Sequence, residues 1–431
     1  MPGPPLVFCL VAMEGPDPYS QAGGLGVRVA GLGQALAHAG FPTHLVFCGD
    51  PDRPERERHG HLTLWRVAQT LSEGHRGGVY DGELRKVAFL DATLPERLVD
   101  DVLAPAVAAG RTPVAIFEEW QAATWARRTS DLLHADGIRH RAVVLWNANN
   151  QYGLDRLDWP TLSFVSGITT VSRFMKQLLG GRFGVDAVVI PNGVPDEAFH
   201  RVAPGDVARL QAAAAPRALL AKIGRFDPDK RWLQAIRAVA QLRARGRAVR
   251  LVLRGGVEPH GEVVLGTARA LGLRVAEWRA PLPDATALAH ALRATADSDV
   301  LDLRTFLPAS LLPTVYAAAT AVLANSGFEP FGLVGLETMA AGGVAVVGAT
   351  GEDYARHLHN SLVIETDAAA ELALGVEALL ADPARAALLR RSARATARTY
   401  RWPLVLSDDL LPRLPTLAAR QGALWPRDGR P

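Results

Sequence analysis

Short apolar runs alternate with amphipathic stretches along most of the chain. The first run, LVFCLVAM at 6–13, has no polar alternation, which is typical of a strand buried on both faces of a parallel sheet. After the glycine-rich SQAGGLG at 20–26, leucine and valine recur at positions 25, 29, 32 and 36, and Gly40 follows. This spacing predicts one face of a helix that ends at the glycine. A second apolar run at 43–48 completes a βαβ unit, so the pattern predicts a parallel, doubly wound sheet.

The alternation runs to about position 193, breaks, and then begins again. Four more strands are expected before the break, at PVAIF (113–117), AVVLW (142–146), GITTVS (167–172) and DAVVIPNG (186–193). The Ala/Pro-rich stretch at 200–217 is interpreted as a joint between domains that also contains the first helix of the second domain. Beyond it, the pattern predicts strands at 218–224, 249–256, 321–325 and 344–349, and helices at 230–246 and 332–341.

Size and charge narrow the class of protein. A chain of 431 residues exceeds the length over which one hydrophobic core keeps growing, so two domains are expected. Apolar residues make up 48% of the chain and charged residues 21%, which is a globular composition and excludes disorder. The net charge of +3 is too small to indicate a nucleic-acid partner. Basic stretches such as 125–131 are interpreted as solvated helix faces, and contact with a membrane surface is an alternative that nothing else indicates.

The two cysteines and the N-terminal run bear on the compartment. Cys9 and Cys48 lie in apolar, strand-like runs, where a free thiol behaves as a small hydrophobic side chain. The first apolar run is short and is followed at once by EGPDPYS, so we interpret it as a strand and not as a signal peptide. No apolar run reaches membrane-spanning length. We therefore expect a reduced, cytoplasmic protein.

Two glutamates stand in an otherwise small and apolar segment, ANSGFEPFGLVGLETMAAGG at 324–343. Glu329 is in the loop after a predicted strand, at the sheet edge where open α/β sheets bind ligands, and Pro330 keeps it out of helical geometry. The unpaired N–H groups that begin the next helix favour an anion there. Glu337 lies on that helix with only apolar residues three and four positions away, so no local cation pairs with it. Ligand hydroxyls would supply the missing donors, and the alternative is that both glutamates are ordinary solvated residues.

A basic pair opens the second domain, in KIGRFDPDKRW at 222–232. Arg225 and Lys230 flank the end of a predicted strand and the start of a helix, so both could reach one polyanion. Asp229 is placed to cap the helix. The alternative is that Asp227 and Asp229 pair with these cations in solvent.

Taken together, these segments resemble the retaining glycosyltransferases of family four, the glycosyl transferases group 1. The resemblance rests on GGLG (23–26), TTVSRF (169–174), VIPNGV (189–194), GRFDPDK (224–230), LVLRGG (251–256) and FEPFGLVGLETMAAGG (328–343) with its E-x7-E spacing. It implies the α/β GT-B fold, in which two Rossmann-like domains with parallel sheets face each other across a cleft. We expect residues 1–196 to form the acceptor-side domain, 197–400 the nucleotide-sugar domain, and 401–431 a helical segment that packs back on the first domain.

The resemblance also assigns roles position by position. It implies that the protein moves a hexose from a nucleoside-diphosphate sugar to an acceptor hydroxyl, with no metal and no other cofactor. Arg225 and Lys230 match the pair that holds the diphosphate, and Glu329 matches the residue that binds the donor sugar's hydroxyls. Glu337 matches the carboxylate that binds the ribose. The remaining donor-binding positions are the amides of Phe331, Gly332 and Leu333 and the loop glycines Gly23 and Gly24.

The acceptor side departs from glycogen and starch synthases within the family. Their loop lysine and aspartate are Gln21 and Val27 here, and Glu118 and Gln121 stand where their HDWHTA segment has histidines. Glucan elongation is therefore not expected. Amides suit a hydroxyl-rich acceptor, although asparagines also fill turns for structural reasons. The acceptor-binding candidates are Gln121, Asn147, Asn149 and Tyr152.

Two other functions were weighed. A nicotinamide-dependent oxidoreductase would explain the first βαβ unit and Asp50 after its second strand, but the glycines do not follow the G-x-G-x-x-G spacing. It also leaves Glu329 and Glu337 without a role. A non-catalytic nucleotide-sugar-binding protein would have the same fold, although the intact basic pair and glutamates argue against it. No Cys/His spacing indicates zinc.

Overall fold

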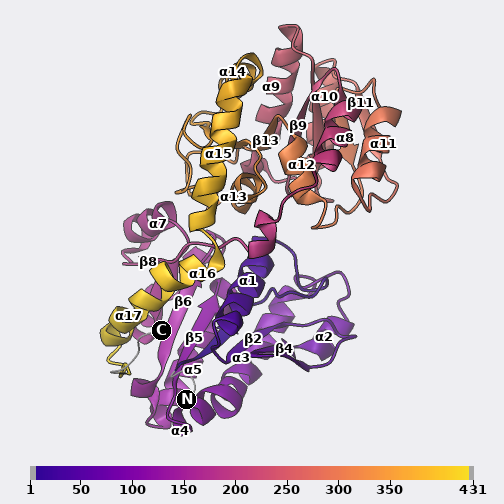
Figure 1. Cartoon of the computed structure of the whole chain (residues 1–431). Helices are drawn as coiled ribbons and strands as arrows, with labels where there is room; N and C mark the ends of the chain where they lie inside the picture. The colour runs from indigo at the N-terminus through magenta and orange to yellow at the C-terminus, as the bar shows by residue number, and fades with distance from the viewer. Residues whose placement is uncertain (1–5, 427–431) are drawn as a thin grey trace. The chain divides into compact units, whose positions relative to one another are not determined.

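The computed structural model describes residues 6–426, which divide into two compact units (Figure 1). One unit is Val194–Tyr400. The other contains the described residues up to Gly193 and those from Arg401 onward. Each unit has its own sheet and its own core, so each is described separately.

The first unit is built on an eight-stranded sheet in the order β3-β4-β2-β1-β5-β6-β7-β8. Its strands are β1 (Leu6–Val11), β2 (Thr43–Cys48), β3 (Arg56–His59), β4 (Leu62–Val67), β5 (Thr112–Glu118), β6 (Val143–Ala148), β7 (Gly167–Thr170) and β8 (Val188–Val189). All neighbours pair in parallel except β3, which is antiparallel to β4. The central strand β1 is buried at every position, as a strand covered on both faces should be.

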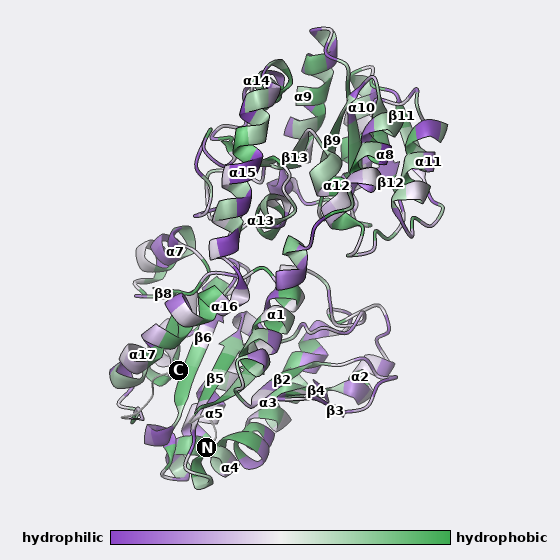
Figure 2. Ribbon diagram, in the orientation of Figure 1, coloured by the Kyte–Doolittle hydropathy of each residue, from purple (hydrophilic) through white to green (hydrophobic). Residues whose placement is uncertain are grey.

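Helices flank this sheet. They are α1 (Gly24–His38), α2 (Gln69–Glu73), α3 (Glu83–Leu98), α4 (Ala104–Ala108), α5 (Ala123–Ala135), α6 (Trp159–Val165), α7 (Arg173–Phe183), α16 (Trp402–Leu404) and α17 (Leu414–Arg420). Helix α1 buries the face that the sequence spacing identified. Figure 2 shows the hydrophobic residues gathered on the strands β5 and β6 at the centre of the unit.

The segment after Tyr400 belongs to the core of the first unit. Trp402, with 3% of its surface exposed, packs in the same cluster as residues of β1 and α1. A Cβ added at Gly31 or Gly193 would lie 2.3 Å from an atom of its indole, so both positions must lack a side chain. The chain thus returns from the second unit to complete the core of the first.

The second unit has a seven-stranded parallel sheet in the order β11-β12-β10-β9-β13-β14-β15. Its strands are β9 (Ala218–Ile223), β10 (Val249–Arg254), β11 (Val275–Trp278), β12 (Val300–Leu303), β13 (Ala321–Ala324), β14 (Ala345–Val347) and β15 (Leu362–Val363). Its helices are α8 (Pro204–Ala214), α9 (Trp232–Ala244), α10 (His260–Ala270), α11 (Ala285–Ala294), α12 (Leu312–Ala318), α13 (Leu333–Ala340), α14 (Ala369–Ala381) and α15 (Pro383–Thr399). Two apolar clusters fill this unit.

The predicted α/β class with two sheets is confirmed, and two details were not foreseen. The hairpin β3–β4 was missed, and it makes one edge of the first sheet antiparallel. The prediction that Asp229 caps a helix was wrong. Asp227 instead accepts a hydrogen bond from the Asp229 N–H at 2.9 Å and caps a 3₁₀ turn at Pro228–Lys230. Among residues 6–426, no helix combines the length and the apolar character needed to span a bilayer.

Candidate functional site

The two motifs of the second unit meet at the carboxyl ends of two neighbouring parallel strands of its sheet. Strands β9 and β13 are parallel neighbours, so the loops after Ile223 and Ala324 leave the sheet side by side. The Gly327 N–H donates to the Asp229 carbonyl at 2.7 Å and ties the two loops together. Segments about a hundred residues apart in the sequence therefore form one surface.

Lys230 and Glu329 are in direct contact on this surface. The Lys230 Nζ lies 2.5 Å from Oε2 of Glu329, and the side chains are 30% and 16% exposed. The Ser326 hydroxyl donates to the same carboxylate oxygen at 2.9 Å. The pair is therefore held in place while remaining open to a ligand.

Arg225 is exposed in the loop that leads to Lys230. Its carbonyl accepts a hydrogen bond from the Trp232 indole at 2.8 Å, which fixes the backbone at the start of the loop. Among the described residues, no carboxylate forms an ion pair with its guanidinium. The alternative in which Asp227 and Asp229 neutralise the basic pair is not what the structure contains, because Lys230 pairs with Glu329 instead.

The loop that carries Glu329 is held by its own backbone. Thr350 Oγ1 accepts from the Glu329 N–H at 2.9 Å, and the Gly351 N–H donates to the Glu329 carbonyl at 2.8 Å. Gly332 caps α13 with a φ of 83°, a conformation that favours glycine. The Phe331 ring is buried against Tyr354 with centroids 5.8 Å apart, so Phe331 can offer a ligand only its backbone.

Glu337 lies on α13 and is partly buried. Its carboxylate accepts a hydrogen bond from the Tyr316 hydroxyl at 3.4 Å, and no described residue forms an ion pair with it. Burial raises the pKa of Glu337 to about 7, and the bond from Tyr316 opposes that shift only in part. A carboxylate in this condition would gain from hydroxyl donors that a ligand brings.

Two ionisable residues behind this surface were missed by sequence reasoning. Lys222 is buried at the end of β9, and its Nζ donates to Asn325 Oδ1 at 2.7 Å and to the Leu323 carbonyl at 2.9 Å. Burial and, secondly, Lys230 hold the pKa of Lys222 well below its usual range. Glu352 is buried under the loop, and burial together with Glu329 raises its pKa to about 8. The sequence signal that could have identified Lys222 is a charged residue inside the apolar run ALLAKIG at 218–224.

In the first unit, the start of α1 is already occupied by a side chain. The buried Glu14 carboxylate accepts hydrogen bonds from the N–H groups of Ala22, Gly23 and Gly26 at 3.2, 2.9 and 3.0 Å. The predicted contact of the Gly23 amide with a phosphate would require Glu14 to release it. Gly24 is exposed and donates no such bond, so it is the better candidate of the two glycines.

The carboxyl ends of β5 and β6 carry a buried polar network. Glu118 Oε1 lies 3.2 Å from Arg28 Nε, and Oε2 accepts from the amides of Asn147 and Asn149 at 2.8 and 2.5 Å. The Thr169 hydroxyl donates to Asn147 Oδ1 at 2.7 Å. Both ends of the Asn147 amide are bonded inside the protein and the residue is buried, so the predicted contact with an acceptor would require this network to open.

Beside this network, several polar atoms are buried without partners. Glu119 has φ 72° and ψ 172°, a region that is essentially restricted to glycine, and its Oε2 makes no hydrogen bond. Burial and the neighbouring Glu118 raise its pKa well above the usual range. Asn149 Oδ1 and Gln121 Oε1 are also unbonded, while Gln121 Nε2 donates to Glu83 at 2.8 Å. Tyr152 is 55% exposed in the loop after β6. No set of three or more His, Cys, Asp or Glu residues within 6–426 is arranged to hold a metal ion.

Comparisons with known proteins identify a glycosyltransferase family in each half of the chain. The family described as Glycosyl transferases group 1 matches residues 211–398, and Glycosyltransferase Family 4 matches residues 22–198. A D-inositol 3-phosphate glycosyltransferase from Salinispora tropica is 30% identical over 232 residues, which are 51% of this chain and 44% of that protein. The matched region therefore spans less than half the length of that relative.

Two solved structures share the fold. Sucrose-phosphate synthase from Thermosynechococcus elongatus superposes with a TM-score of 0.67 at 20% identity, over 96% of this chain and 100% of that one. The catalytic domain of starch synthase IV from Arabidopsis thaliana, bound to ADP and acarbose, has a TM-score of 0.67 at 16% identity, over 97% and 99% of the two chains. With one family matched in each half and this fold in common, the chain belongs to the glycosyl transferases group 1 and has the GT-B fold.

Proposed function

We propose that the protein is a retaining glycosyltransferase that moves a hexose from a nucleoside-diphosphate sugar to an acceptor hydroxyl. The observation that carries the proposal is the 2.5 Å contact between Lys230 and Glu329, because it joins the two motifs at the carboxyl edge of the second sheet. In a nucleoside-diphosphate sugar the sugar is bonded directly to the diphosphate. Lys230 as the cation for the diphosphate and Glu329 as the carboxylate for the sugar hydroxyls are adjacent in the same way.

Charge stabilisation is the main task of such a site. As the bond between the sugar and the diphosphate breaks, negative charge develops on the departing phosphate. Arg225, which is exposed and unpaired, and Lys230 would hold that charge together with the N–H groups that begin α13. Glu337 lies on the same helix and is proposed to accept hydrogen bonds from the ribose hydroxyls.

The acceptor side favours retention over inversion. Inversion would need a general base on the acceptor side, and the adjacent Glu118 and Glu119 are the candidates there. Glu118 is buried and already bonded to Arg28, Asn147 and Asn149. Burial and the neighbouring Glu118 raise the pKa of Glu119 well above its usual range, which disfavours the ionised form that a general base needs. In the route that we propose, the departing phosphate oxygen takes the proton of the acceptor hydroxyl on the same face of the sugar.

The oxidoreductase alternative finds no support at α1. A dinucleotide would place its pyrophosphate on the N–H groups at the start of this helix, and Glu14 takes three of them. A non-catalytic nucleotide-sugar-binding protein would use the same donor site, so only a turnover measurement separates it from an enzyme.

Thermal unfolding with nucleotides tests the proposed donor site. A ligand that binds only the folded protein raises the melting temperature by mass action. At least one of UDP, GDP and ADP should therefore raise Tm at saturation, and NAD should not. If NAD raises Tm while all three nucleoside diphosphates leave it unchanged, the proposal is wrong.

A further inference from the structure

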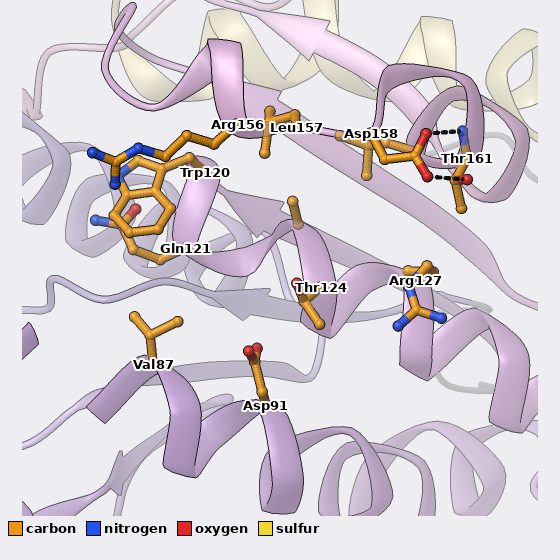
Figure 3. Close-up of a pocket in the computed structure, with 12 residues that line it drawn as sticks. Val87, Asp91, Trp120, Gln121, Thr124, Arg127, Arg156, Leu157, Asp158 and Thr161 are labelled. Carbon is orange, nitrogen blue, oxygen red and sulfur yellow. Dashed lines mark hydrogen bonds between the residues drawn. The ribbon is translucent and has the colours of Figure 1, made fainter. Parts of the chain in front are cut away.

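A second candidate binding site lies in the first unit, in a pocket between three helical segments (Figure 3). Its volume is about 300 Å³, near the lower limit for pockets that take small molecules. Helix α3 contributes Val87 and Asp91, and the turn at Trp120–Ala122 and α5 contribute the facing wall. The segment from Arg156 to Leu162, which leads into α6, closes the third side.

Two hydrogen-bond acceptors in this pocket are buried without partners. Gln121 is 5% exposed, its Oε1 makes no hydrogen bond, and its nitrogen is already bonded to Glu83. Asp91 Oδ1 is also buried and unbonded, and Figure 3 shows its carboxylate pointing from α3 toward Thr124. Burial raises the pKa of Asp91, and the nearby Trp125 N–H opposes that rise, although neither Asp91 Oδ1 nor Trp125 Nε1 makes a hydrogen bond of normal geometry. Buried acceptors of this kind require donors.

The other charged groups of the pocket decide which donors fit. Asp158 is committed to capping α6, where it accepts from the N–H and the hydroxyl of Thr161 at 3.2 and 2.6 Å. Arg127 pairs with Asp131 at 3.1 Å. Arg156 lies over the Trp120 ring at 5.1 Å, and its guanidinium makes no hydrogen bond or ion pair with a described residue. The polar groups without a hydrogen-bond partner are therefore two acceptors and one donor, while the Trp120 ring already lies against Arg156.

This set fits a neutral, hydroxylated ring. Each hydroxyl can donate to Asp91 or Gln121 and can accept from Arg156. A free phosphate fits less well, because two of the three free polar groups are acceptors that would repel it.

We propose that this pocket binds one sugar ring of the acceptor, at a distance from the hydroxyl that receives the hexose. The pocket residues Trp120 and Gln121 directly follow Glu118 and Glu119 at the end of β5, so the pocket and the polar network are neighbours. The inference rests on the proposed glycosyl transfer and extends it: the acceptor is a glycoside or an oligosaccharide and not a single sugar.

Saturation-transfer NMR without nucleotide tests the pocket directly. The probes are the methyl α-glycosides of glucose and mannose, the methyl β-glycoside of galactose, and myo-inositol, each measured alone. We expect saturation transfer to at least one of them. Asp91→Ala and Arg156→Ala should each weaken that binding roughly tenfold, which corresponds to one lost hydrogen bond. Glu96→Ala and Arg85→Ala, exposed residues of the same helix α3, are matched controls that should leave it unchanged.

The outcomes separate this inference from the proposed function. Absence of transfer to every probe, or binding that survives both pocket substitutions in folded protein, overturns the inference while nucleotide binding stands. If a probe binds but no nucleoside diphosphate raises Tm, the pocket stands and the donor site fails. With an active acceptor in hand, Asp91→Ala should raise the acceptor KM about tenfold and leave the nucleotide-induced shift in Tm intact.

Discussion

The charge of Glu337 should make nucleotide binding depend on pH. Its pKa of about 7 in the folded protein lies above the ordinary value of 4.5, so the folded state keeps a proton that the unfolded state loses between those values. The contribution of Glu337 to the free energy of unfolding therefore falls as pH rises through this window. A protonated Glu337 would donate a hydrogen bond itself, whereas the ionised carboxylate only accepts hydrogen bonds, as the proposed contact with the ribose hydroxyls requires. The affinity for a nucleoside diphosphate should therefore rise from about pH 6 to about pH 8.

Isothermal titration in two buffers of different ionisation enthalpy measures this effect. Wild type should release protons when the nucleotide binds near pH 7, and Glu337→Gln should release fewer and bind more weakly. The same substitution should raise Tm above pH 7, because it removes a buried charge. Glu352, whose pKa is about 8, changes its charge in the same pH range. Comparison of wild type with Glu337→Gln separates the proton release of the two residues. Identical proton release in both proteins would remove Glu337 from the binding site.

Arg225 should matter mainly for turnover. Arg225→Ala removes an exposed cation that faces charge developing on the leaving diphosphate, and we expect kcat to fall about a hundredfold, or about 3 kcal/mol. Arg237→Ala, an exposed arginine of the neighbouring helix α9, is the control and should have little effect. A steady-state assay with a normal kcat for Arg225→Ala would show that Arg225 takes no part in the reaction.

The sequence identified residues that belong to a local motif. It did not identify residues whose importance depends on their buried contacts in the folded protein. The sequence singled out Lys230 and Glu329 separately, and their direct contact became visible only because strands β9 and β13 proved to be neighbours. The burial of Glu14 at the start of α1 could not be foreseen, because a lone glutamate in a loop carries no sign of its partners. Likewise, the sequence could suggest an amide-rich acceptor edge but not that Asn147 is buried and bonded to Glu118 and Thr169.

At the scale of elements, the backbone geometry before α13 should be sensitive to substitution. Gly332→Ala places a Cβ where φ is 83° and where Glu352 Cγ and the Tyr354 hydroxyl oxygen would lie at 2.7 and 2.9 Å. We expect a lower Tm and weaker nucleotide binding, because the start of the helix must shift. Gly266→Ala, in the exposed middle of α10 with open space around its Cβ, should be neutral or stabilising by up to about 1 kcal/mol. Thermal unfolding and nucleotide titration of both variants measure this, and unchanged affinity in Gly332→Ala would contradict it.

The hairpin β3–β4 shows why one element escaped prediction. Strand β3 has the sequence RERH and is mostly exposed, so it lacks the apolar pattern that identifies a buried strand. It forms because its neighbour β4 offers an edge, and because Glu57 pairs with the buried Arg66 at 2.8 Å. Charged edge strands are common in proteins, since charge discourages pairing with other molecules. Strands with a long apolar run, such as β1 and β5, were predictable from the sequence.

At the scale of the molecule, the residues after Tyr400 should stabilise the first unit alone. Trp402→Ala empties a core position between Gly31 and Gly193, a change that typically costs about 3–5 kcal/mol. Hydrogen exchange followed by mass spectrometry should show faster exchange in β1 and α1 and no change within Val194–Tyr400. Leu404→Ala, at a position 38% exposed in the same short helix, is the control. Equal acceleration in both units would mean that they unfold as one.

We propose that this protein transfers a hexose with retention while its own cations hold the leaving diphosphate. Proton NMR of the fresh product tests it most directly, in a reaction with a nucleoside-diphosphate sugar and an accepted acceptor in the presence of EDTA. We expect transfer to continue with the chelator present and the anomeric coupling of the product to match that of the donor. An inverted coupling, or activity that is lost in EDTA and restored by magnesium, would contradict it.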